Sequence, residues 1–110
     1  MYLALCIFAE VLEVIKVEYI TGNRPIGIWM SSTNHLYVTY SGDNVVKVVN
    51  TNGIVSLFAG NYENGYNGEN RPPTSAKLNY PYQSLADTVG NFYISDQYNN
   101  RVRIISKSDG

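Results

Sequence analysis

Residue types that bind ions or phosphates are concentrated between residues 60 and 80 of the 110-residue chain. Two acidic residues there stand among asparagines that could offer oxygen atoms to Ca²⁺: Glu63, Glu69, Asn61, Asn64, Asn67 and Asn70. Their spacing fits no EF-hand-like loop. The sequence "GYNG" at 65–68 resembles a phosphate-binding loop, but Pro72-Pro73 follows it where a helix N-terminus is required. We therefore predict neither a metal site nor a phosphate site in this stretch.

Catalytic residue types are sparse in the rest of the chain. His35 is the one histidine and Cys6 the one cysteine, so the sequence contains no histidine cluster, internal disulfide or thiolate metal cluster. Eight Lys and Arg against nine Asp and Glu give a net charge of −1, without the basic stripe that tracks a phosphate backbone. We expect no catalytic residue and no cofactor, and nucleic-acid binding is unfavourable.

An apolar run opens the sequence, "MYLALCIFA", and Glu10 ends it. A membrane-spanning helix needs about 20 apolar residues. A secretory signal also begins with basic residues, which this run lacks. We therefore expect no membrane partner, and the compartment is not predicted.

The chain repeats itself with an offset of 56 residues. The offset aligns identical residues without a gap, among them Pro25 with Pro81, Tyr37 with Tyr93, Asn44 with Asn100, and Val46 with Val102. Alternating apolar residues predict one buried face in each repeated strand: Leu36 and Val38, Phe92 and Ile94, Val46 and Val48, Val102 and Ile104. The repeat therefore predicts two similar β-sheet units.

Short strands separated by tight turns predict an all-β fold. Asn52-Gly53 and Asp109-Gly110 are preferred pairs for two-residue hairpins. We expect seven strands, at about 26–31, 35–40, 45–50, 54–59, 82–87, 91–95 and 101–106. A four-strand period is typical of a β-propeller blade or a related all-β stack, and we expect a partial β-propeller with antiparallel blades: one full blade, one three-stranded blade and a possible N-terminal half-blade. No helix-length amphipathic segment supports an α/β fold.

Three segments follow from this interpretation. Residues 1–23 form a degenerate N-terminal segment, interpreted as outer strands of a preceding blade. Residues 24–80 form a blade with a long insertion at 60–80, and residues 81–110 form a second blade that lacks its outer strand. Within 1–20 the β-branched "VLEVI" favours strands, whereas charged residues at every third position from Glu10 to Lys16 also suit a helix.

The stretches "LYVTYSGDNVVKVV" and "SDQYNNRVRII" resemble the NHL repeat family of β-propellers. Blades of that family begin with Pro and continue through a Gly-Asn turn, a strand ending in Asp, and Asn-x-Arg before the next strand. Residues 59–81 resemble its Gly-rich insertion, and the whole resemblance covers 17–110. Tyr40 and Val45 replace the Asp and Arg in the first blade, while Pro73 and Glu69 depart from the usual insertion residues. The first blade is therefore expected to keep its packing and lose part of its polar bracing.

Propeller topology places the connections 40–44, 60–80 and 96–100 at one end of the blades, where loops on a rigid scaffold commonly bind partners. The expected partner-contact face contains Tyr40, Asp43, Tyr62, Tyr66, Asp96, Tyr98 and Asn99. Loop bracing is expected from Asp96, Asn100, Asn44, Gly65 and Gly68. Leu78 is expected to fill the core between the blades. Arg101 and Arg103 are expected to cover tyrosines or lie in water.

The resemblance implies a non-catalytic binding or scaffold module with a protein partner. The alternative is part of a propeller enzyme, of a metal-dependent lyase or hydrolase type, whose catalytic residues lie in other blades. RNA binding is a third, less favoured option. Because closure takes about four to eight blades, we expect a fragment of a longer propeller whose further blades are partners. A homo-oligomer that closes a ring, with strand 17–21 completing a neighbouring copy, is the other interpretation.

Overall fold

The computed structural model describes residues 21–107. The predicted N-terminal half-blade, the choice between strand and helix in residues 1–20, and the Asp109-Gly110 turn lie outside the described residues. Within 21–107, no helix is long and apolar enough to cross a membrane.

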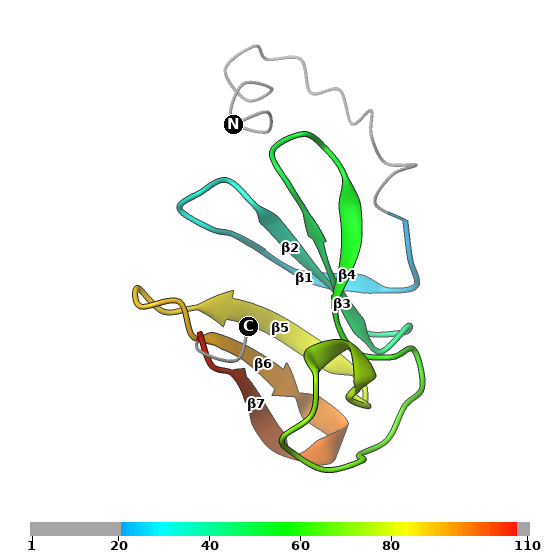
Figure 1. Ribbon diagram of the computed structural model, residues 1–110. Helices are drawn as coiled ribbons and strands as arrows, with labels where there is room; N and C mark the ends of the chain where they lie inside the picture. The colour runs from blue at the N-terminus through cyan, green and yellow to red at the C-terminus, as the bar shows by residue number, and fades with distance from the viewer. Residues whose placement is uncertain (1–20, 108–110) are drawn as a thin grey trace.

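Two antiparallel sheets make up the fold, which is all-β and part of a β-propeller (Figure 1). The first sheet contains β1 (Pro25–Met30), β2 (Leu36–Tyr40), β3 (Val45–Val49) and β4 (Val55–Ala59) in chain order. The second sheet contains β5 (Pro81–Ala86), β6 (Phe92–Asp96) and β7 (Arg101–Ile105) in chain order. Two single-turn 3₁₀ helices complete the described part: η2 (Pro73–Ser75) and η3 (Gln97–Asn99). The seven expected strands are confirmed, and each bound is within one residue of its prediction.

The two sheets follow the same backbone path, as the 56-residue repeat predicts. Left-handed backbone conformations occur at the same three places in both: Arg24 and Tyr80, Asn34 and Gly90, Asn44 and Asn100. The first pair precedes the prolines that open β1 and β5, and the other two lie in the turns around β2 and β6. Such conformations are uncommon outside glycine, so their recurrence ties the repeat to backbone geometry.

An apolar core lies between the sheets, on what we call the near face of each. Its buried members are Val46, Ala59, Leu78, Phe92 and Ile94. Trp29, Tyr37 and Phe58 pack around Phe92, with ring centroids 6.0, 4.6 and 4.6 Å from its own. Aromatic rings at such separations add to the stabilisation from buried area. The expectation that Leu78 fills the core between the blades is confirmed.

The prediction for β7 assigned the wrong residues to its buried face. Val102 and Ile104 are each 59% exposed, whereas Arg103 is buried. Arg103 lies opposite Ile94, on the near face, and Ile104 lies opposite Tyr93, on the far face of the second sheet. Alternation defines two faces of a strand but does not determine which one is covered. A buried carboxylate partner, Asp96, allows the arginine to occupy the covered face.

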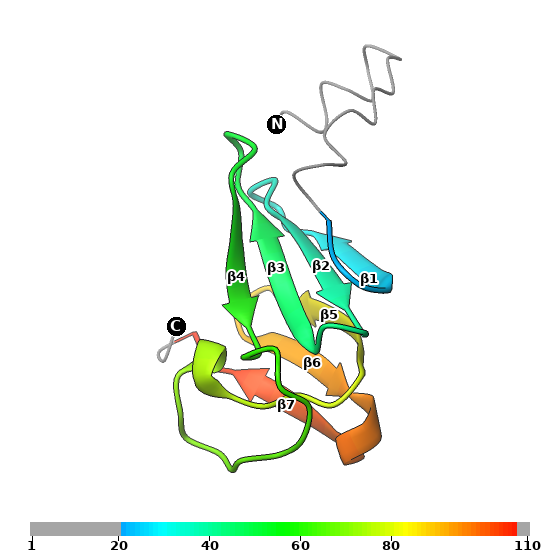
Figure 2. The same cartoon turned by 90° about the vertical axis from the view of Figure 1, so that its right-hand side faces the viewer.

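The sheets approach most closely where β5 passes β1 and β2 (Figure 2). A Cβ atom on Gly27 would lie 2.5 Å from the Tyr82 carbonyl oxygen and 3.0 Å from the Gln83 Cα. Nearby, the buried hydroxyl oxygens of Thr39 and Ser84 lie 3.1 Å apart and form a hydrogen bond across the two sheets. Glycine at position 27 therefore sets the spacing of the blades.

Replacing Gly27 by Ala should lower the free energy of unfolding by about 1–3 kcal/mol, because the added methyl group forces a backbone shift in β5. Urea denaturation measures this, with Ser56→Ala at an exposed strand position as the control, which should change stability by no more than ~0.5 kcal/mol. Equal stabilities of Gly27→Ala and the control would contradict this account of the blade spacing.

The turn between β5 and β6 is closed by one carboxylate. Asp87 Oδ1 accepts the backbone N–H groups of Val89, Gly90 and Asn91 at 3.0, 2.9 and 2.9 Å. Its Oδ2 accepts the Tyr93 hydroxyl at 2.8 Å. These bonds, that from the Asn91 backbone foremost, lower the pKa of Asp87 from 3.8 to about 2. The turn is therefore stabilised by the ionised carboxylate.

Acid should weaken this turn within a defined pH window. A lowered folded-state pKa gives stability that is fully present above the unfolded pKa of 3.8 and is lost as the pH falls towards about 2. Thermal melting of the wild type and Asp87→Asn from pH 5 to pH 2 should show a difference in Tm that narrows below about pH 4. A difference that stays constant across this range would refute the role of the charge.

Candidate binding face

Three connections meet at one end of the blades and form what we call the loop face: residues 40–44, 60–80 and 96–100. Asn44 Oδ1 accepts the Tyr80 N–H at 2.8 Å, which joins the first connection to the second. Asn99 Nδ2 donates to the Gly65 carbonyl at 2.8 Å and joins the third to the second. The chain therefore brings these segments side by side through specific hydrogen bonds.

A buried ion pair anchors the loop face to the second sheet. Arg103 Nη1 donates to Asp96 Oδ2 at 2.9 Å, and the two side chains are 9% and 0% exposed. Asp96 also accepts the Asn79 N–H at 2.7 Å and Asn99 Nδ2 at 2.8 Å. Each of these donors compensates part of the cost of removing a carboxylate from water. Asp96 thus fixes the end of the insertion, η3 and β7 relative to one another.

Arg103 also binds the backbone of the insertion directly. Its Nη1 donates to the Lys77 carbonyl and its Nη2 to the Gly68 carbonyl, both at 3.1 Å. Gly65 and Gly68 have φ of 128° and 99°, which glycine adopts without a Cβ penalty. The planar guanidinium can therefore hold two turns of the loop at once.

Tyr66 lies on this anchor. The Arg101 guanidinium carbon is 4.0 Å from its ring centroid, and that of Arg103 is 5.1 Å away. The Tyr66 hydroxyl donates a hydrogen bond to Glu69, which raises the pKa of Tyr66 and lowers the pKa of Glu69. Glu69 in turn lies 3.8 Å from Arg101 and 3.9 Å from Arg103. The Tyr66 ring is exposed yet held by cation–π contacts and its hydroxyl.

A second aromatic pair completes the loop face. The rings of Tyr80 and Tyr98 stack with centroids 4.7 Å apart and an angle of 17° between their planes. The Tyr98 N–H donates to the Asn79 carbonyl at 3.0 Å, so its backbone is fixed as well. Tyr62, Tyr66 and Tyr98 are all exposed. The loop face therefore presents tyrosine rings, two of which are held by side-chain contacts.

The first blade keeps two of these backbone hydrogen bonds with different residues, and Tyr40 takes the place of the buried carboxylate Asp96. In the 56-residue repeat, Lys47 corresponds to Arg103 and Thr21 to Lys77. Lys47 donates to the Thr21 carbonyl at 2.9 Å, which is the equivalent of the bond from Arg103 to the Lys77 carbonyl. Its Nζ also lies 5.0 Å from the centre of the Tyr40 ring. Asp43 Oδ2 accepts the Asn23 N–H at 2.8 Å, the bond that Asp96 makes with Asn79.

Two members of the expected contact face are not at the surface. Tyr40 and Asp96 are fully buried, because each is the last residue of a central strand and points into the packing that supports the loops. Asp43 and Asn99 are half-buried and hydrogen-bonded within the chain. Asn100 supplies the left-handed residue that ends η3, and its side chain is exposed.

The sequence did not reveal every residue of the loop face. Tyr80 was missed, although its place before the Pro that opens a blade is a usable signal. The roles of Arg101 and Arg103 as supports of Tyr66 were predicted only as a general covering of tyrosines. Arg103 contacts Asp96 diagonally across β6 and β7, because Arg101 lies opposite Asp96 and Arg103 opposite Ile94; the 56-residue repeat alone does not give this register.

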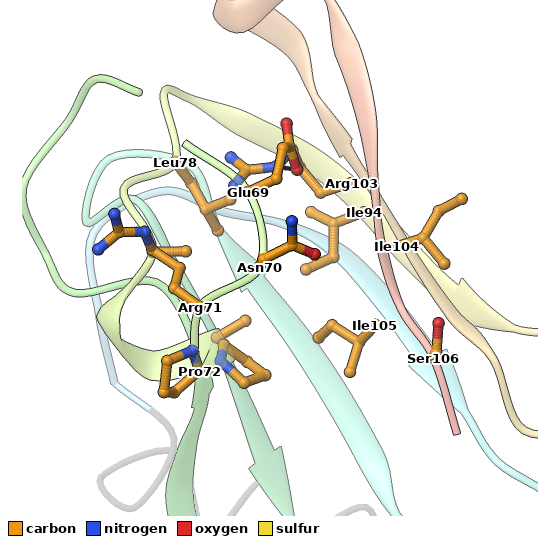
Figure 3. A pocket seen from close by; sticks show the side chains of 13 residues that line it. Glu69, Asn70, Arg71, Pro72, Leu78, Ile94, Arg103, Ile104, Ile105 and Ser106 are labelled. Carbon is orange, nitrogen blue, oxygen red and sulfur yellow. Dashed lines mark ion pairs between the residues drawn. The ribbon is translucent and has the colours of Figure 1, made fainter. Parts of the chain in front are cut away.

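A pocket of about 590 Å³ lies between the insertion and β7 (Figure 3). Glu69, Asn70 and Arg71 line it on the insertion side, while Ile94, Ile104 and Ile105 line it on the sheet side. The lining contains both charged and apolar groups. It lies beside β7, which pairs with β6 and with no other strand in the described part of the chain. No group of three or more His, Cys, Asp or Glu within 21–107 could hold a metal ion.

Comparison with known proteins identifies fold relatives. No protein-family model matches the sequence, and no curated protein matches it. The chain is similar to virginiamycin B lyase from Staphylococcus aureus, with a TM-score of 0.56 and 15% identity over 80% of this chain and 25% of the lyase. It is also similar to an auxiliary nutrient binding protein from Bacteroides thetaiotaomicron, with a TM-score of 0.57 and 25% identity over 73% of this chain and 21% of that one. Both of these relatives are β-propeller proteins. This chain spans about a quarter or less of the length of each.

Replacing Arg103 by Met should lower the free energy of unfolding by about 3–5 kcal/mol, because Asp96 would remain buried without its counter-charge. The matched control is Arg101→Met, which breaks an exposed ion pair and should cost less than about 1 kcal/mol. Chemical denaturation of both variants provides the measurement.

If Arg103→Met does not fold, Arg103→Lys keeps the charge and should fold with intermediate stability. Equal losses in the variants of residues 101 and 103 would show that burial of the pair has no special role.

Proposed function

We propose that this chain is a non-catalytic binding module within an NHL-type β-propeller, and that it contacts a protein through the loop face. The observation that carries the proposal is the placement of exposed Tyr62, Tyr66 and Tyr98 on loops that are braced by partly buried hydrogen bonds. Tyrosine offers a large contact area with few rotatable bonds, and it is enriched at the centres of protein interfaces.

Bracing of the loop supports a binding role because it reduces the entropy lost on association. Tyr66 is already fixed by Arg101 and by its bond to Glu69, and Tyr98 is stacked on Tyr80. Ordering a side chain at an interface costs about 0.5–1.5 kcal/mol, so pre-ordered side chains leave more of the contact energy for affinity.

Charge at the loop face favours a protein over a nucleic acid. Arg101 lies near Glu69, Arg103 is paired with Asp96, and Lys77 Nζ lies 3.3 Å from Glu63. Cations that are already paired within the protein release few counterions from a phosphate backbone, so such a surface gains little affinity for RNA or DNA.

Further blades are the other partners that we propose. The chain spans 25% and 21% of the two propellers that it resembles, and closure of a propeller takes about four to eight blades. A second candidate function is a segment of a propeller enzyme of the metal-dependent lyase or hydrolase type, which the lyase among the fold relatives favours. Metal analysis of the purified full-length protein separates the two, since a stoichiometric bound ion would support the enzyme.

Changing Tyr62, Tyr66 and Tyr98 together to Ser should reduce partner capture by on the order of 10-fold or more while the melting temperature changes little. Quantitative capture from the native lysate compares the wild type, the triple variant and Tyr82→Ser, a matched exposed tyrosine on β5 outside the three connections. Proteins lost with the triple variant and kept with the control are the expected result. An identical set for all three would rule out the loop face as the contact surface.

A further inference from the structure

The far face of the second sheet is apolar and exposed. Leu85 lies opposite Tyr93, Tyr93 opposite Ile104, and Ser95 opposite Val102, so these residues share one face. Leu85, Val102 and Ile104 are exposed there. Clustered exposed apolar side chains on a small domain commonly mark an interaction surface.

The repeat identifies what this face is built to contact. Shifted by 56 residues, Leu85, Tyr93 and Val102 correspond to Trp29, Tyr37 and Val46. Those three belong to the near face of the first sheet, where they pack in the core against the second sheet. Val46 is 0% exposed and its equivalent Val102 is 59% exposed. The far face of the second sheet therefore repeats a surface that is buried between blades elsewhere in the same chain.

The complementary half of this interface is also present in the chain. Ser84 on β5 is 1% exposed and contacts Thr39 across the blades, whereas its repeat equivalent, Ile28 on β1, is 64% exposed. Ile28 lies opposite Val38, and Met30 opposite Leu36, on the far face of the first sheet. The chain thus leaves part of each side of the blade-to-blade contact exposed, at Ile28 and Met30 on β1 and at Val102 on β7, while Val38 and Tyr40 farther across the first sheet are buried within the chain.

We propose that a second copy of this chain docks head to tail, with the exposed β1 side of its first sheet against the far face of the second sheet. The contact would reproduce the packing of β5 on β1 and β2, with Ile28 of the next copy near Val102 and Ser95. Two different patches meet in such a contact, so repetition of the same rotation closes a ring. About two to four copies would supply the four to eight blades that closure takes.

This inference rests on the proposed function in one respect, that further blades complete the propeller. It adds that these blades come from further copies of the same chain. It does not involve the loop face, so loss of assembly and loss of partner capture are separate outcomes. Lysine substitutions at Val102 or Ile28 place a charge in the docked interface and should prevent it. Neither residue belongs to the buried core between the two sheets.

Sedimentation velocity of the 110-residue chain at several concentrations tests the proposal. The wild type should form one discrete species of two to four copies, whereas Val102→Lys and Ile28→Lys should each sediment as a monomer. The matched control is Ile54→Lys, at an equally exposed apolar residue in the β3–β4 turn, which should assemble like the wild type. Circular dichroism should show the same strand content in all four proteins.

Mixing the two variants gives the sharpest outcome. Val102→Lys keeps an intact first-sheet face and Ile28→Lys an intact second-sheet face, so an equal mixture should form a dimer with one productive interface and no ring. A wild-type chain that is monomeric at all concentrations would overturn the proposal. So would an assembly that persists in Val102→Lys, or a mixture that remains monomeric.

Discussion

The loop face depends on one buried ion pair, between Asp96 at the end of β6 and Arg103 on β7. Burial of a lone charge is costly, so each group must find several partners. Asp96 therefore binds the insertion backbone at Asn79 and the side chain of Asn99, and Arg103 binds the carbonyls of Gly68 and Lys77. Because both buried charges require these partners, the loops above the sheet are held in fixed positions.

The first blade shows that this constraint is geometric and does not require a particular pair of residues. Lys47 reaches the preceding carbonyl, and Asp43, from the next turn, accepts the N–H that Asp96 accepts in the second blade. Tyr40 fills the carboxylate position and lies under the lysine. Both solutions hold the segment before a blade against the end of its second strand. The repeat therefore preserves hydrogen-bonded backbone positions while the side chains that make the bonds change.

The strands could be predicted from the sequence because alternation and turn chemistry are local. Leu78 was also predictable, since one large apolar residue stands in a polar insertion. The covered face of β7 was not predictable, because the burial of Arg103 depends on its ion pair with Asp96 on the neighbouring strand. Tyr40 and Asp96 were wrongly predicted to lie at the surface for a similar reason. A residue at the junction of strand and loop can point either way, and tertiary contacts decide which.

Two surfaces of different character result from these contacts. At the loop face the aromatic rings are exposed but their backbone and polar groups are satisfied within the chain, so a partner gains contact area without breaking an existing network. On the far face of the second sheet, the apolar side chains of Val102 and Ile104 are exposed to water. Burial of such side chains contributes about 25 cal/mol per Å² of apolar area. Because the first sheet buries the equivalent of Val102 against its neighbour, the same energetic term that joins the two described blades favours covering this face too. Recognition at the loops and assembly through the sheets can therefore proceed without competing for the same residues.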